Sequence, residues 1–244
     1  MRRPKIIAAT GLKTEARIIA GPHVHAIACG GDTRRLEDAL ERLAGNRAAA
    51  IISFGVAGGL MPGLAPGVKL IARSVISEDG ASFACDPVWS ERLMSVSSGA
   101  LRADIAGVSA PLATYGEKHA LYLRTGAQAA DMESHVAARV AATHNLPFAA
   151  FRVVADPAER RLPHAALVAL NPDGSIAFWA IARSLLGSPA QIPQLLRIGK
   201  DAQVAFFALF RSRKLLAGTL GIGDFSELAL DVPAEDILSG TLEA

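Results

Sequence analysis

The sequence contains little of what marks several common classes of protein. Cysteine occurs only twice in 244 residues, at Cys29 and Cys85, and neither stands in a CxxC or metal-like spacing. We therefore expect buried free thiols and a reducing, cytoplasmic compartment. Aromatic residues make up 5% of the chain and the formal net charge is only +2, so no base-stacking or basic nucleic-acid surface is predicted.

Long hydrophobic runs are missing too, although the chain is 51% hydrophobic with a mean hydropathy of +0.30. No stretch reaches the roughly 18–20 uninterrupted apolar residues that a membrane-spanning helix needs. The apolar run near the N-terminus is too short for a signal peptide. The composition instead predicts a sizeable hydrophobic core.

Several ligand-binding motifs are also absent. The glycine-rich segment at residues 55–59 is neither a dinucleotide-binding GxGxxG nor a phosphate-binding loop. Ser53 and Ser134 lack the surroundings of a hydrolase nucleophile. His23 and His25 share one face of a predicted strand but have no further ligands nearby, so we predict neither a metal site nor a cofactor.

The first two thirds of the chain alternate short β-branched runs with helical patterns. Strands are predicted at residues 5–9, 24–29, 50–54, 68–76, 128–131 and 147–154, and helices at 11–20, 33–43, 87–95, 118–124 and 132–144. We interpret residues 55–59 as a turn that ends the third strand. This order predicts an α/β fold with three αβα layers and a mixed central sheet.

The alternation of strand and helix patterns ends at about residue 163. Residues 176–186 and 192–216 are predicted to form apolar helices, the second with basic residues between its apolar ones. We divide a single domain into a core at about 4–187, an apolar helical extension at about 188–218, and a poorly ordered tail at 219–244.

Three acidic residues follow predicted strands. Glu15 comes after the first strand, Glu133 after residues 128–131, and Asp156 after residues 147–154. Each alone has an ordinary explanation, such as an exposed helix residue, a favourable helix N-terminus or a turn. Ligands of such sheets bind beyond the carboxyl ends of the strands, so we expect the three to converge on one site.

Four segments together resemble the purine nucleoside phosphorylase and nucleosidase superfamily. They are GLKTEARIIA at 11–20, FGVAGGL at 54–60, AADMES at 129–134 and FRVVAD at 151–156. The resemblance covers roughly residues 4–185. Within the superfamily the chain is most similar to the hopanoid-associated phosphorylase group, whose proposed substrate is adenosylhopane. That resemblance implies release of adenine and formation of ribosylhopane or its phosphate, without a cofactor, by a homo-oligomer.

The resemblance also implies roles for individual residues. Glu133 would accept hydrogen bonds from the ribose hydroxyls, with Met132 packed against the sugar. Asp156 would be the general acid at the purine, and Glu15 would orient or deprotonate the attacking water. Cleavage builds positive charge on the ribose and negative charge on the base, which suits a carboxylate at the first and a proton donor at the second. Asp156 must then be protonated near neutral pH, which requires a desolvated site.

The implied pocket backbone is Val56, Ala57 and Gly58. Related phosphorylases carry a phosphate-binding arginine where Glu15 stands, whereas nucleosidases carry a glutamate, so the resemblance favours hydrolysis. Nucleosidases usually have serine at the places of Val56 and Ala155. These apolar replacements point to a lipid-linked nucleoside as the substrate.

Other interpretations stay open. The C-terminal helices could form a trough for a hopane skeleton, a contact with the surface of the inner membrane, part of the core, or a dimer interface. The alternatives for function are a phosphorylase on the same substrate, a nucleosidase for a small soluble nucleoside such as methylthioadenosine, and a non-catalytic binding protein. The last predicts that Asp156→Asn leaves every activity unchanged.

Overall fold

The computed structural model describes residues 5–45, 48–171, 173–216 and 220–222. Their strands form one mixed sheet in the order β2-β1-β3-β7-β6-β4-β5, with β8 paired to both β3 and β4. The strands are β1 (Lys5–Thr10), β2 (Val24–Ala28), β3 (Ala48–Gly59), β4 (Lys69–Ile76), β5 (Ser82–Ala84), β6 (Leu101–Gly107), β7 (Ala129–Asp131) and β8 (Phe148–Asp156).

Five of the strands close into a ring. β3 is parallel to β8, β8 is antiparallel to β4, β4 is parallel to β6, β6 is parallel to β7, and β7 returns antiparallel to the end of β3. Because β7 pairs with Gly58 and Gly59, the chain that follows it runs back along β3. This crossing decides where the residues after Asp131 lie.

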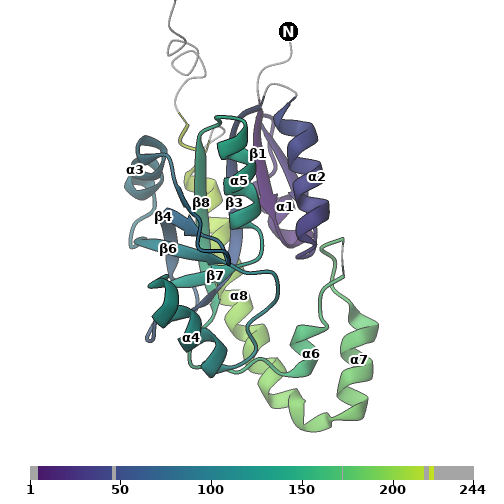
Figure 1. Cartoon of the computed structure of the whole chain (residues 1–244). Coiled ribbons are helices and arrows are strands. Elements are labelled where there is room, and N and C mark those ends of the chain that lie inside the picture. The colour runs from purple at the N-terminus through teal and green to yellow at the C-terminus, as the bar shows by residue number, and fades with distance from the viewer. Residues whose placement is uncertain (1–4, 46–47, 172, 217–219, 223–244) are drawn as a thin grey trace, which may run out of the picture.

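Helices cover both faces of the sheet (Figure 1). They are α1 (Lys13–Ile19), α2 (Thr33–Ala44), α3 (Pro87–Val96), α4 (Tyr115–Thr125), α5 (Ser134–Thr143), α6 (His164–Leu167), α7 (Phe178–Gly187) and α8 (Ile192–Leu215). Local chemistry marks several of their starts. The Asp32 carboxylate accepts the Arg35 N–H at the start of α2, and Thr114 and Glu117 form a capping box on α4.

The alternation of side chains along the central strands builds two cores. Ile7 and Ile51 pack with the buried faces of α2 and α5, whereas Ile6 and Ile52 pack with α1, α3 and α8 on the other side. Successive residues of a strand point to opposite faces, so a strand covered on both sides has a continuously apolar sequence. The predicted three-layer αβα architecture is confirmed.

Some predicted elements differ from those in the structure. The turn at residues 55–59 is wrong, because β3 continues through Gly59 and pairs there with β8 and β7. β5 and β6 were not predicted. Cys29 and Cys85 are confirmed as buried free thiols, and burial raises the pKa of Cys85 to about 12. The acidic part of the tail, predicted to be poorly ordered, lies outside the described residues.

The last helix is more integral to the fold than an extension. Ala205 and Leu209 of α8 are fully buried in the core beneath β3 and β8. The first half of α8 instead projects beyond the sheet, together with α6 and α7 (Figure 1). Among the described residues, no helix is both long enough and apolar enough to cross a bilayer.

Candidate active site

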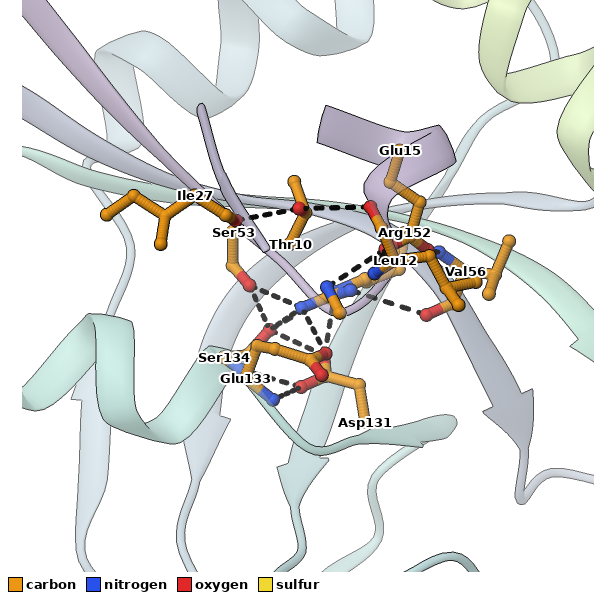
Figure 2. A network of polar contacts seen from close by, with 11 residues as sticks. Thr10, Leu12, Glu15, Ile27, Ser53, Val56, Asp131, Glu133, Ser134 and Arg152 are labelled. Atoms are coloured by element: carbon orange, nitrogen blue, oxygen red, sulfur yellow. Dashed lines mark hydrogen bonds and ion pairs between the residues drawn. The ribbon is translucent and has the colours of Figure 1, made fainter. Parts of the chain in front are cut away.

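A fully buried arginine, Arg152, lies at the centre of the candidate site (Figure 2). It stands in the middle of β8, and its Nε lies 2.8 Å from Asp131 Oδ2. Its Nη2 donates to Glu133 Oε2 at 3.4 Å and also to the Ser53 hydroxyl. A buried guanidinium is tolerated only when it is paired in this way, so the arginine orients the acidic groups around it.

Asp131 connects the arginine to the start of α5. Its Oδ1 accepts the backbone N–H groups of Glu133 at 3.0 Å and Ser134 at 2.7 Å, and its Oδ2 accepts the Ser134 hydroxyl. The Ser134 hydroxyl oxygen also lies 3.0 Å from the hydroxyl oxygen of Ser53 on β3, from which it can accept a hydrogen bond. The chain is therefore turned sharply after β7, which places the Glu133 side chain beside Arg152.

Glu15 approaches the same arginine from α1. Its Oε2 accepts the N–H groups of Gly11 and Leu12 at 2.9 and 2.8 Å, and its Oε1 accepts that of Val56 at 2.8 Å. Burial raises the pKa of Glu15, while Arg152 and the three backbone N–H groups oppose the shift. A raised pKa suits a base that must take a proton near neutral pH.

Two glycines make room for these carboxylates. A Cβ on Gly55 would lie 2.5 Å from Glu15 Oε1 and 2.8 Å from Arg152 Nη1, and a Cβ on Gly11 would lie 2.7 Å from Glu133 Oε1. All three distances are too short for contacts between non-bonded heavy atoms. The glycine at residue 55 is thus explained by the approach of Glu15 and Arg152 to β3, rather than by a turn.

Burial perturbs the pKa of Glu133 strongly as well. Burial is the main cause, and Asp131 and Glu15 add to it, so that its pKa rises to about 8 despite the attraction of Arg152. Three carboxyl groups share one guanidinium here. The site therefore has an excess of negative charge whenever two or more of them are ionised.

Asp156 lies at the end of β8, four residues beyond Arg152, which corresponds to roughly 13 Å along an extended strand. Its Oδ2 is 2.5 Å from Nζ of Lys118, a fully buried lysine of α4. Its Oδ1 is buried and has no hydrogen-bond partner among the described residues. Burial raises the pKa of Asp156, and the Lys118 ammonium opposes that shift.

One cavity of about 540 Å³ connects the two groups of charged residues. Glu15, Glu133 and Asp156 all line it, together with Met132 and the segment Val56, Ala57 and Gly58. The structure therefore brings every predicted site residue to one cavity. The roles assigned to them stay predictions.

The rest of the cavity wall is apolar. Side chains of α7, α8 and the loop before α7 contribute most of the far wall, including Leu170, Ile176, Ile181, Leu195, Ile198 and Phe206. Val56 and Ala155 line the cavity on the side of the sheet. The cavity therefore has both charged residues and a long apolar wall.

Sequence reasoning missed Arg152, Asp131 and Lys118. A signal existed for Arg152, because a lone charged residue in an otherwise apolar central strand needs a buried partner. Asp131 closes a short predicted strand directly before Glu133, which is a weaker signal. Lys118 had none, since an isolated lysine in an amphipathic helix is usually on the surface.

One protein-family model matches more than half of the chain. Residues 32–187 match the family model of the phosphorylase superfamily. The chain belongs to that superfamily. A comparison with curated protein sequences found no match.

Solved structures of the same fold include several nucleosidases. A futalosine hydrolase mutant of Helicobacter pylori aligns over 87% of this chain and 99% of its own, with 15% identity and a TM-score of 0.60. The 5′-methylthioadenosine/S-adenosylhomocysteine nucleosidase of Neisseria meningitidis gives 86% and 98%, with 15% identity and a TM-score of 0.62. That of Streptococcus pneumoniae gives 85% and 99%, with 17% identity and a TM-score of 0.58. At these identities the likeness establishes the fold.

Proposed function

We propose that this protein is a nucleosidase, which hydrolyses the N-glycosidic bond of a nucleoside. The observation that carries the proposal is that one cavity is lined by two separate groups of acids. Glu15 and Glu133 line it beside Arg152, which stands in the middle of β8, and Asp156 lines it at the end of β8. A ribose beside the first pair would have carboxylates near its developing positive charge, and a base beside Asp156 would have a proton donor near its developing negative charge.

In this mechanism the C1′–N9 bond breaks and its electrons move to the base. Asp156 donates a proton to the base, and the ionised form of Glu133 stabilises the positive charge that develops on the ribose. Glu15 takes a proton from the water that attacks C1′, so one proton enters at the base and one leaves at the water. Exchange with solvent restores both carboxyl groups.

Water is favoured over phosphate by charge. Asp131, Glu133 and Glu15 surround one guanidinium, and that guanidinium is already bonded to Asp131, Glu133 and Ser53. A phosphate dianion beside Arg152 would meet net negative charge whenever two or more of these carboxyl groups are ionised. Arg17, two residues after Glu15 on α1, is exposed and lies outside the cavity lining.

We infer a lipid-linked adenine nucleoside, adenosylhopane, as the substrate, with adenine and ribosylhopane as products. The support is the apolar wall formed by α7 and α8, which a small soluble nucleoside would leave empty. Val56 and Ala155, both lining the cavity, are apolar as well. The choice of hopane as the lipid rests on the resemblance of the sequence motifs to the hopanoid-associated group.

We also propose that α7 and the exposed face of α8 dock on an anionic lipid surface. Phe178, Trp179 and Leu186 of α7 are 74%, 89% and 85% exposed, and every residue of α7 keeps some exposure. Residues 178–215 contain six basic residues and a single acidic one, Asp201. Exposed aromatic residues beside basic ones suit the interface of an anionic bilayer, from which a lipid-linked substrate would enter.

Adenine release from adenosylhopane, measured with and without phosphate, tests the function. We expect release in both conditions at the same rate, with ribosylhopane identified by mass spectrometry. Strict dependence on phosphate would establish the phosphorylase instead, and faster turnover of methylthioadenosine would establish the small substrate. No release from either nucleoside would refute the proposal.

Two variants complete this experiment. Glu15→Gln should reduce turnover by several orders of magnitude and retain binding of adenine, because only the water-activating carboxylate is lost. Arg17→Gln is the matched control on the same helix, and it should leave turnover unchanged. Loss of a phosphate-dependent reaction in Arg17→Gln would instead assign phosphate binding to Arg17.

A further inference from the structure

Each N–H donor of the buried Lys118 ammonium group has an acceptor. It donates to Asp156 Oδ2 at 2.5 Å and to the carbonyl oxygens of Pro157 and Arg160 at 2.9 and 3.0 Å. A protonated lysine has three N–H donors, and these three acceptors match them. A neutral amine would have two donors and would direct its lone pair at the third oxygen.

This arrangement leaves the two oxygens of Asp156 unequal. Oδ2 is held by Lys118, whereas Oδ1 is buried without a partner among the described residues, in a side chain that lines the cavity. A buried unpaired polar oxygen is costly unless a ligand satisfies it. Oδ1 is therefore the atom of this carboxyl group that is open to a bound base.

We propose that Lys118 is a positioning residue for Asp156, which holds Oδ2 so that Oδ1 alone serves the base and which balances the carboxylate left after proton donation. This inference rests on the proposed nucleosidase function. In the step itself, the proton on Oδ1 passes to the departing base as the C1′–N9 bond breaks. Asp156 then carries a negative charge that the ammonium group neutralises at Oδ2.

The other charged groups near Lys118 and Asp156 make different contacts. Arg160, on the loop after β8, also lowers the pKa of Asp156, and it is ion-paired with Asp201 of α8. Glu159 is exposed and accepts the Gly63 N–H. The Arg152 group lies four residues back along β8. Lys118 is thus the charged group in direct contact with the Asp156 carboxyl.

The inference predicts a change in the pH dependence of turnover. Without the ammonium group, the buried carboxyl keeps its proton to higher pH, because its ionised form has lost its partner. In Lys118→Met we therefore expect the alkaline limb of kcat/KM to move up by about one to three pH units. At neutral pH, kcat should fall by about 10²-fold, because the charge that develops on Asp156 is no longer balanced.

Two variants separate this role from a structural one. Lys118→Arg keeps the positive charge and should restore most of the pH profile. Arg124→Met removes an exposed cation from the same helix and should change nothing. If Lys118→Met lowers activity but its pH profile coincides with that of the unmodified protein, the positioning role is refuted.

A second measurement needs no substrate, so it remains decisive if the proposed function fails. The free energy of unfolding of Lys118→Met is compared with that of Lys118→Met/Asp156→Asn across pH. The single variant should lose stability relative to the double variant as pH rises from the ordinary pKa of an aspartate toward the raised pKa of the buried Asp156, because the unfolded chain has already released the proton that the folded protein still holds. A difference that stays constant with pH would overturn the inference whatever the reaction proves to be.

Discussion

Replacement of Glu133 by glutamine should make the protein more stable and less active at the same time. Glu133 is 6% exposed, and burial beside Asp131 and Glu15 raises its pKa from 4.5 to about 8. The folded protein then binds a proton between those pH values that the unfolded chain has already released. Stability accordingly falls as pH rises through this window.

The size of the effect follows from the shift. Each pKa unit corresponds to about 1.4 kcal/mol, so at pH 7 the buried acid costs on the order of 3 kcal/mol relative to acidic pH. The amide of Glu133→Gln does not titrate and avoids this cost. Turnover should nevertheless fall by about 10²-fold or more, because the amide has no ionised form to stabilise positive charge on the ribose, whereas Glu133 can lose its proton.

Urea denaturation, followed by circular dichroism from pH 5 to pH 9, measures the difference between the two proteins. We expect Glu133→Gln to gain stability over the unmodified protein up to about pH 8 and the gain then to level off. Glu91→Gln changes an exposed glutamate and should show a constant difference. A constant difference for Glu133→Gln as well would mean that Arg152 keeps Glu133 ionised throughout, and it would refute the reasoning.

Three further predictions concern the packing around Gly55, the role of Glu15 and the exposed surface of α7. Gly55→Ala should lower turnover at least 10-fold and cost about 1–3 kcal/mol of stability in urea denaturation, because its Cβ would meet Glu15 Oε1 at 2.5 Å. Glu15→Gln should reduce turnover by about 10²–10⁴-fold while adenine binding, measured by calorimetry, persists. Trp179→Ser should weaken co-sedimentation with phosphatidylglycerol vesicles, whereas Leu123→Ser, which changes an equally apolar side chain that is 71% exposed on α4, should not. A shift from dimer to monomer in Trp179→Ser, with vesicle binding unchanged, would assign the α7 surface to a second copy of the chain.

Much of the fold could be predicted because it depends on local patterns. β1, β2, β4 and β8 follow their apolar runs closely, and α2 begins at its Asp32 cap. β6 was missed because Leu101–Gly107 mixes apolar residues with Arg102 and Asp104, and its pairing with β4 and β7 is long-range. Residues 55–59 were interpreted as a turn because glycine usually marks one. Tertiary contacts, through the carboxylate of Glu15, instead explain Gly55.

The sequence by itself determined the layered α/β fold, the placing of acidic residues after strands, and the motifs shared with the phosphorylase superfamily. Those features depend on local residue patterns or on the order of residues along the chain. Only the tertiary structure decided that Arg152 lies among Asp131, Glu133 and Glu15, and that Lys118 lies against Asp156. Each of these contacts joins separate elements whose side-chain geometry depends on the closed ring of strands. The three acids named from sequence thus line one cavity in two groups, Glu15 and Glu133 beside the buried Arg152 and Asp156 against the buried Lys118.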